Sequence, residues 1–328
     1  MNRRDVIKAG VAALSAPALS PLSALAQAKY PERPIKLVIP FSPGGVTDIV
    51  GRHWAERMKG PLGGSIFIEN QGGAAGTVGA TQVARADADG HTLLLGNTSV
   101  MVLNPMTKDN LSYDPKDFVP IGILCVATVA LVVNASVPVK TLKEFVDYAK
   151  SNAGKVSYGS AGAGTMTHLA GEKFKLLTGL KDLTHVPYKG AGPGIADLIS
   201  GHIPAMTPNI TSQILEHERA GKLRALAAFA PQRLKGAPNV PTAIEAGFPD
   251  MVGQLFVGVF VRSGTPKPVL DQIAASNQKV MADPEFQRIL LASGLEPIND
   301  TPDQARKFLT DENTRWAPVV KAIGLKVE

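Results

Sequence analysis

The sequence has 328 residues, of which 45% are hydrophobic and 5% aromatic, and its formal net charge is +6. This length is sufficient for a sizeable core and for more than one domain. Basic residues do not cluster with aromatic residues, which argues against nucleic-acid binding, and after the N-terminal segment no apolar run is long enough to span a bilayer. Cys125 is the only cysteine, so an intrachain disulfide is impossible, and its apolar neighbours predict a buried strand residue.

The first 28 residues are typical of a secretory signal. Arg3, Arg4 and Lys8 precede an alanine-rich apolar run that ends in small residues suited to cleavage. The paired arginines favour the twin-arginine pathway, although a general secretory signal can also carry two arginines. Removal of residues 1–26 takes away three basic residues and Asp5, so the net charge falls from +6 to +4. We therefore expect export to the periplasm.

The remaining sequence alternates short β-rich runs with helical patterns, which predicts an α/β fold with mostly parallel strands flanked by helices. Predicted strands cover residues 35–39, 65–69, 92–95, 118–126, 130–133, 156–158, 184–186, 225–228 and 257–261. Predicted helices cover residues 47–58, 76–86, 142–151, 165–178, 192–200, 211–220, 267–282, 284–293 and 301–323.

Two extended segments are expected to cross between two lobes. A continuous apolar run at 127–135 gives the first crossing, and a second run near 254–261 gives the return. This arrangement predicts lobe 1 from residues 29–130 plus 254–328 and lobe 2 from residues 131–253. Two extended crossings are what a hinged, two-lobed receptor requires.

Two stretches share one design, a strand that runs into a glycine-rich turn at the start of a helix. The first is 35–39 followed by 40–48 (PFSPGGVTD), and the second is 156–158 followed by 159–168 (GSAGAGTMTH). A helix N-terminus has unpaired amides and a partial positive charge, so it binds anions, and glycine lets the backbone approach a ligand. Two such turns, far apart in sequence, predict two lobes that face one small anionic ligand.

The first turn supplies several candidate ligand contacts. The amides of Gly44, Gly45 and Val46 are expected to face a carboxylate. The hydroxyls of Ser42 and Thr47 either donate to the ligand or cap the helix. Asp48 would repel an anion, so we expect it to stabilise the helix start or to bind an amino group of the ligand.

Further candidates follow other strands. Asn97 and Thr98 come after a predicted strand, at the edge where open α/β sheets bind ligands, although an ordinary turn explains them equally well. The second turn contributes Ser160, Ala161, Gly162 and Thr165, whereas His168 fits a structural role better than a ligand contact. Tyr188 and Lys189 end a strand near a glycine turn that is placed to close over the cleft, and Lys189 also fits a solvated surface position.

Motifs for other chemistry are incomplete or missing. The sequence has no zinc-ligand set and no phosphate-binding loop of the nucleotide-hydrolase type, and Thr167 replaces the third glycine of a dinucleotide fingerprint. Ser160 does not lie in a G-x-S-x-G motif, and only His168 is a local base for it. We therefore predict no cofactor and no metal, and an exported hydrolase that uses Ser160 and His168 is the weaker alternative.

The chain resembles the Bug-type receptors of tripartite tricarboxylate transporters. The likeness opens with YPERPI at 30–35 and VIPFSPGG at 38–45 followed by Asp48. It continues through residues 69–70, 72–76, 88–94, 104–105, 113–115, 158–160, 164–165, 168–169, 185–190, 221–226, 240–242 and 245–247. The matches therefore cover nearly the whole chain after the signal.

The resemblance implies a monomeric periplasmic binding protein of type II that closes on a mono- or dicarboxylate and delivers it to membrane transporter subunits. It also implies that the turns containing Phe41 and Ser160 hold the proximal carboxylate. Asn209 lies where the family places variable residues that meet the distal part of the ligand. Receptors of this shape also serve as sensing partners of signalling proteins, and the sequence does not name the carboxylate.

Overall fold

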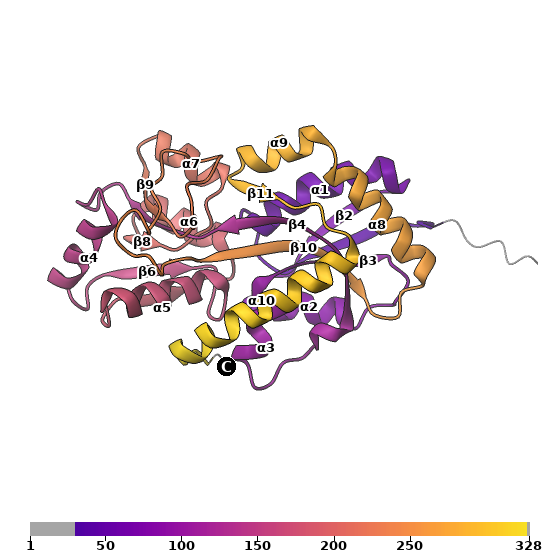
Figure 1. The fold of residues 1–328 in the computed structure, drawn as a ribbon, viewed down its shortest axis with the longest axis horizontal. Helices are drawn as coiled ribbons and strands as arrows, with labels where there is room; N and C mark the ends of the chain where they lie inside the picture. The colour runs from indigo at the N-terminus through magenta and orange to yellow at the C-terminus, as the bar shows by residue number, and fades with distance from the viewer. Residues whose placement is uncertain (1–29, 327–328) are drawn as a thin grey trace, which may run out of the picture.

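Two separate β-sheets, each flanked by helices, form the two lobes of the molecule (Figure 1). The structure is a computed structural model that describes residues 30–326. The predicted signal peptide lies outside the described residues. Within them, no helix combines the length and the apolar character needed to cross a membrane.

The sheet of lobe 1 has its parallel strands at one side. β1 pairs in parallel with β2 and β3, whereas β10 runs antiparallel to both β3 and β4. The strand order is β11 (Leu295–Pro297), β4 (Phe118–Thr128), β10 (Gln254–Arg262), β3 (Thr92–Asn97), β1 (Ile35–Ile39) and β2 (Ile66–Asn70). The helical segments of this lobe are α1 (Val46–Leu62), η1 (Ala74–Gly76), α2 (Thr77–Ala84), η2 (Ser99–Leu103), α3 (Asn104–Thr107), η3 (Pro115–Asp117), α8 (Lys267–Met281), α9 (Pro284–Ala292) and α10 (Pro302–Ile323).

The sheet of lobe 2 repeats this design. β6 pairs in parallel with β7 and β8, and β5 runs antiparallel to β8 and β9. The strand order is β7 (Thr184–Pro187), β6 (Ser157–Ser160), β8 (Ala205–Met206), β5 (Ala130–Asn134) and β9 (Leu223–Ala228). Its helices are α4 (Leu142–Ser151), α5 (Met166–Thr178), α6 (Ala191–Ser200) and α7 (Ser212–Arg219).

The α/β fold with two lobes, each a mixed sheet flanked by helices, is confirmed. The crossing strands β4 and β10 and the strand β5 add antiparallel pairs beside the parallel strand–turn–helix units. The prediction missed β8 and β11, which are too short to show alternation, and the helical segments η2 and α3 that follow β3.

The chain passes between the sheets through a small set of hydrogen-bonded backbone segments. Val129 links β4 to β5, and its amide donates to the carbonyl of Gly253 at 2.9 Å. The amide of Phe229, directly after β9, donates to the carbonyl of Val129 at 2.7 Å. Figure 1 shows the C-terminal helices, orange to yellow, beside the indigo N-terminal elements of lobe 1.

The cores contain mostly aliphatic and aromatic side chains. Trp54 of α1 is fully buried, and its indole nitrogen donates to Oδ1 of Asn277 at 2.8 Å. Cys125 is fully buried in β4, as predicted, and burial raises the pKa of its thiol. A thiol held in its protonated form is a poor nucleophile, so Cys125 is a packing residue.

Candidate functional site

A small cavity lies between the lobes where β1, β3 and β6 end and where α1 and α5 begin. We call it the inner cavity, and its volume is about 30 Å³. Its lining residues come from both lobes: Phe41, Gly45, Val46, Thr47, Asn97, Ser99, Ala161, Thr165, Met166, Thr167, Ala191, Asn209 and Leu255. None of these residues carries a formal charge, so the inner cavity is a neutral, mainly apolar site with a few hydrogen-bonding groups.

The N-terminus of α1 opens onto the inner cavity. Gly44 has a φ of +88°, a conformation that favours glycine, and it turns the chain from β1 into the helix. Gly45 occupies the N-cap position without a capping side chain, and Gly45, Val46 and Thr47 all line the inner cavity. The first-turn amides of this 17-residue helix therefore form an anion-binding end directed at the site.

The carboxylate of Asp48 forms its hydrogen bonds within lobe 1. It accepts hydrogen bonds from the Gly44 amide at 3.1 Å, from Arg52 at 2.9 and 3.0 Å, and from Nδ2 of Asn70 at 3.0 Å. Burial alone would raise the pKa of Asp48, but these hydrogen bonds outweigh it and hold the pKa below its ordinary value. Asp48 therefore fixes the turn, and the Gly44 amide is committed to Asp48 rather than free for a ligand.

The turn of lobe 2 forms more hydrogen bonds within itself than the sequence predicted. The amide of Ala161 donates to Oγ1 of Thr167 at 2.9 Å, and the amide of Gly162 donates to Oγ of Ser160 at 3.1 Å. Thr165 caps α5, its Oγ1 accepting from the amide of His168. Two of the predicted donor amides thus have acceptors within the turn.

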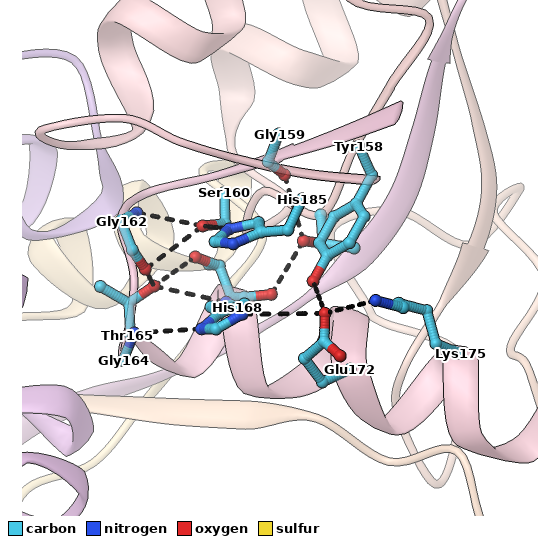
Figure 2. Close-up of polar contacts among 12 residues, drawn as sticks. Tyr158, Gly159, Ser160, Gly162, Gly164, Thr165, His168, Glu172, Lys175 and His185 are labelled. Carbon is cyan, nitrogen blue, oxygen red and sulfur yellow. Dashed lines mark hydrogen bonds and ion pairs between the residues drawn. The ribbon is translucent and has the colours of Figure 1, made fainter. Parts of the chain in front are cut away.

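A network of polar side chains lies behind this turn (Figure 2). Oγ of Ser160 lies 2.7 Å from Nε2 of His185, and the rings of His185 and His168 stack with centroids 3.8 Å apart. Nδ1 of His168 accepts from the amide of Gly164 at 3.1 Å, while its Nε2 lies 3.7 Å from the Glu172 carboxylate. His168 thus supports the turn, and the histidine within hydrogen-bond distance of Ser160 is His185.

Burial controls the charge of the stacked imidazoles. Burial lowers the pKa of His168 to about 4, and burial with the adjacent His168 lowers the pKa of His185 to about 3. Glu172, which accepts from Tyr158 at 2.7 Å and Lys175 at 3.1 Å, is the carboxylate of the network. Both histidines are therefore neutral at neutral pH, and the network is a hydrogen-bonded support for the turn.

Among the polar side chains of the inner cavity, Asn209 gives the strongest indication of a bound ligand. It is 5% exposed, and its Nδ2 has no hydrogen-bond partner among the described residues. Asn97, in contrast, is used internally, since its Oδ1 accepts from the Val100 amide at 3.2 Å and its Nδ2 lies 3.5 Å from Oγ1 of Thr47. Thr98 does not line the cavity, and its Oγ1 accepts from the Phe256 amide at 2.9 Å.

Direct contacts between the lobes show a closed arrangement. Oγ of Ser42 donates to the carbonyl of Lys189 at 3.1 Å, and the amide of Met166 donates to Oγ of Ser99 at 3.0 Å. Gly192 lies so close to the first turn that a Cβ there would stand 2.0 Å from the carbonyl oxygen of Pro43. These contacts tie the first turn to the segment around Lys189 and Gly192, and the start of α5 to Ser99.

A second, larger cavity adjoins the first, since Phe41 and Ala161 line both. This outer cavity has a volume of about 230 Å³, and its other lining residues are Gly73, Ala74, Ala75, Gly76, Lys108, Gly162, Ala163, Pro187, Tyr188 and Lys189. Within residues 30–326, no cluster of metal-ligating side chains occurs.

The structure brings together part of the predicted set. Lining one or both cavities are Phe41, Gly45, Val46, Thr47, Asn97, Ala161, Gly162, Thr165, Tyr188 and Asn209. The other predicted residues line neither cavity and instead support the turns or the interlobe contact: Ser42, Gly44, Asp48, Thr98, Ser160 and His168. Four further lining residues were not predicted from the sequence. Ser99 directly follows the predicted Asn97 and Thr98, whereas the sequence carries no signal for Ala191, Leu255 and Lys108.

Comparisons with known proteins agree with this architecture. The family model described as "Tripartite tricarboxylate transporter family receptor" matches residues 50–325. Protein BugT of Bordetella pertussis is 33% identical over 91% of this chain and 92% of its own length. An R. palustris protein solved with adipate has a TM-score of 0.86 at 30% identity, covering 90% of this chain and 99% of that one.

MatC of Rhodopseudomonas palustris, solved with bound malate, has a TM-score of 0.83 at 32% identity and covers 89% of this chain and all of its own. The family match spans well over half of the chain, and the relatives match along nearly their whole length. The chain therefore belongs to the Bug-type receptors of tripartite tricarboxylate transporters, which are periplasmic solute-binding proteins and not enzymes.

Proposed function

We propose that this protein is a periplasmic receptor that binds a small mono- or dicarboxylate between its lobes and delivers it to a tripartite tricarboxylate-type membrane transporter. Two relatives with the same fold were solved with adipate and with malate, which supports a carboxylate ligand here. We also propose the lobe boundaries that the sequence predicts, residues 29–130 plus 254–328 for lobe 1 and residues 131–253 for lobe 2. The receptor acts as an exported monomer that meets the transporter transiently.

One observation carries the proposal. The N-terminus of α1, which has no capping side chain, lines the same cavity as Asn209, whose buried Nδ2 has no hydrogen-bond partner within residues 30–326. A buried donor without an acceptor destabilises a protein, and an uncapped helix N-terminus attracts negative charge. A carboxylate supplies acceptor oxygens for both groups at once, which a sugar hydroxyl or a cation does less well.

The proximal carboxylate is held by neutral donors in this proposal. Among the described residues, no lysine or arginine lines the inner cavity, whereas Gly45, Val46 and Thr47 at the start of α1 do. Each hydrogen bond to a charged group contributes on the order of 1.5–3 kcal/mol before ordering costs, so a few are sufficient for micromolar affinity. The ligand also bridges the lobes and shifts the open–closed equilibrium toward the closed form.

Isothermal titration tests the proposal. The panel contains acetate, malate, adipate, citrate, benzoate and glutamate, with adipamide as an uncharged analogue and glucose and putrescine as ligands of other classes. We expect heat of binding from at least one carboxylate and none from adipamide. Heat from glucose or putrescine alone would overturn the proposal.

A variant of the first turn links the binding to the inner cavity. A Cβ at Gly45 would already lie 3.4 Å from Cβ of Ala191, so Gly45→Val places methyl groups between the lobes. We expect Gly45→Val to weaken carboxylate binding more than the replacement of any single lysine. A parent-like affinity for Gly45→Val, with loss of binding in one lysine variant, would contradict a site built from neutral donors.

A further inference from the structure

Two stacked imidazoles lie behind the turn of lobe 2 (Figure 2). The rings of His168, on α5, and His185, on β7, have centroids 3.8 Å apart and planes 10° from parallel. The turn and the start of α5 contribute Ala161, Thr165 and Thr167 to the inner cavity, whereas neither histidine is among its described lining residues. The stack therefore acts on a ligand only through the turn that it supports.

The imidazole of His168 accepts a hydrogen bond from the turn. Its Nδ1 lies 3.1 Å from the amide nitrogen of Gly164, and a backbone amide can only donate. The proton of the neutral ring is therefore on Nε2, which faces the Glu172 carboxylate at 3.7 Å. A second proton, on Nδ1, would place one donor against another and break the hydrogen bond to Gly164.

The imidazole of His185 accepts from the turn through Ser160. Oγ of Ser160 accepts from the Gly162 amide at 3.1 Å and lies 2.7 Å from Nε2 of His185. The Gly162 carbonyl, 3.2 Å from Oγ of Ser160, already accepts from Oγ1 of Thr165 at 2.7 Å and from the Thr165 amide at 3.2 Å. Donation from Ser160 to His185 is therefore favoured, and it requires Nε2 of His185 without a proton.

The charged side chains that face the stack, among the described residues, are both on α5. The carboxylate of Glu172 favours the charged form of His168, whereas the ammonium group of Lys175 disfavours charge on both rings. β6 adds the phenol of Tyr158, which donates to Glu172 at 2.7 Å and has its ring centroid 5.0 Å from that of His185. Burial outweighs the attraction of Glu172, and the pKa is about 4 for His168 and about 3 for His185.

Closure contributes to this burial, because lobe 1 covers the start of α5. The amide of Met166 donates to Oγ of Ser99 at 3.0 Å, and both residues line the inner cavity. Opening of the lobes breaks this contact and gives water access to the first turn of α5, which contains His168. A ring that is better hydrated accepts a proton more readily.

We propose that His168 and His185 are positioning residues that hold the lobe 2 turn in its ligand-binding shape only while both imidazoles are uncharged, so that protonation and ligand binding oppose each other. This inference rests on the proposed function, because it takes the turn to face a bound carboxylate. By linkage, protons that bind the open form more tightly than the closed form shift the equilibrium toward the open form and release the ligand in acid.

Isosteric pairs of variants test whether the two acceptors position the turn. His168→Asn keeps an acceptor near the place of Nδ1, and His168→Leu has the same shape without one. His185→Gln and His185→Met form the corresponding pair at Nε2. Isothermal titration at pH 7.5 uses whichever of acetate, malate, adipate, citrate, benzoate and glutamate binds the parent most tightly. We expect the Leu and Met variants to bind about tenfold more weakly than their Asn and Gln isosteres, because a donor of the turn has lost its acceptor.

The pH dependence separates positioning from packing. The ratio of Kd at pH 5 to Kd at pH 7.5 is measured for the parent, for His168→Asn/His185→Gln, and for the control His217→Gln on α7. Titration of the ligand enters all three ratios equally. We expect the ratio of the parent to exceed that of the double variant by at least about threefold, with a limit of about 30-fold for His168 if opening restores the ordinary pKa of 6.5. The control should match the parent.

The outcomes distinguish this inference from the proposed function. Ratios for the parent and the double variant that differ by less than about threefold would overturn the proton-linked positioning and leave carboxylate binding intact. Equal affinities within both isosteric pairs would do the same. Absence of binding by every carboxylate to the parent at pH 7.5 would instead overturn the proposed function. Urea unfolding at both pH values establishes that each variant is folded, and the single variants His168→Asn and His185→Gln allow the same comparison if the double variant is not.

Discussion

The amide nitrogen of Asn209 is a hydrogen-bond donor that burial has removed from water without giving it an acceptor among the described residues. Asn209→Ala removes this donor, so we expect the Kd of the best carboxylate to rise about tenfold. Asn209→Asp puts a negative charge in the same place and is expected to weaken binding further. Isothermal titration measures both, with urea unfolding to establish that each variant is folded. Parent-like affinity in both variants would remove Asn209 from the site.

The stacked imidazoles of His168 and His185 predict a loss of stability in mild acid. Their pKa values, about 4 and about 3, lie below the ordinary value of 6.5 because burial disfavours the charged rings. The unfolded chain therefore binds protons first, and the free energy of unfolding falls as the pH drops from about 6.5 toward 4. For His168 alone the full loss is on the order of 3 kcal/mol. Urea unfolding at pH 7.5 and pH 5 measures the part of this loss that falls above pH 5, on the order of 2 kcal/mol for His168.

Variants isolate the contribution of this network from that of other groups. The double variant His168→Gln/His185→Gln removes both titrating rings, so the difference in unfolding free energy between pH 7.5 and pH 5 should shrink by more than half. His217→Gln on α7 is the control, because α7 lies outside the network. A pH dependence that is unchanged in the double variant would mean that other groups control acid stability.

At the scale of elements, α6 and the first turn make a close backbone approach between the lobes. A Cβ at Gly192 would stand 2.0 Å from the carbonyl oxygen of Pro43, although the helical backbone of Gly192 itself accepts alanine. Gly192→Ala should therefore prevent full closure while leaving lobe 2 folded. We expect at least a tenfold loss of carboxylate affinity, since closure is what brings both lobes to the ligand. Small-angle scattering should show no compaction on addition of adipate or malate.

A matched change in α1 controls for helix propensity. Gly60 lies inside α1, and a Cβ added there would meet no atom within 4 Å, so Gly60→Ala changes propensity without touching the cleft. Both variants gain up to about 1 kcal/mol of helix stability, and only Gly192→Ala should lose affinity. A Gly192→Ala variant that binds and compacts like the parent would show that α6 and the first turn do not limit closure.

Much of the order of helices and strands was predictable, because hydrophobic periodicity and turn-forming residues depend on the local sequence. The prediction for α4 agrees with the structure at both ends, since Thr141 caps its start and the apolar stripe is regular. The first turn was found from the glycines after β1, and Gly44 does adopt the left-handed conformation. Local signals of this kind do not depend on the other lobe.

Contacts between distant segments could not be predicted in the same way. The pairing of Ser160 with His185 joins β6 to β7, and no spacing rule distinguishes His185 from His168 as the partner. The placement of Lys108 at the same cavity as Lys189 depends on how the lobes close. The amides of Ala161 and Gly162 looked available in sequence, but side chains of their own turn accept from them.

At the scale of the whole molecule, closure brings uncharged residues of both lobes around the inner cavity. Salt screens exposed charges within about 10 Å at 0.1 M but screens interactions between neutral donors and a bound carboxylate much less. A carboxylate held by neutral donors should therefore respond weakly to ionic strength.

The last prediction is a salt titration of ligand binding. Between about 20 and about 500 mM NaCl, the affinity for the best monocarboxylate should change by less than about threefold, because neutral donors hold its carboxylate. The same series in potassium glutamate, with glutamate excluded as a ligand by titration, separates screening from competition by chloride. A steep loss of affinity with salt would show that formal charges, and not the α1 amides and Asn209, hold the proximal carboxylate.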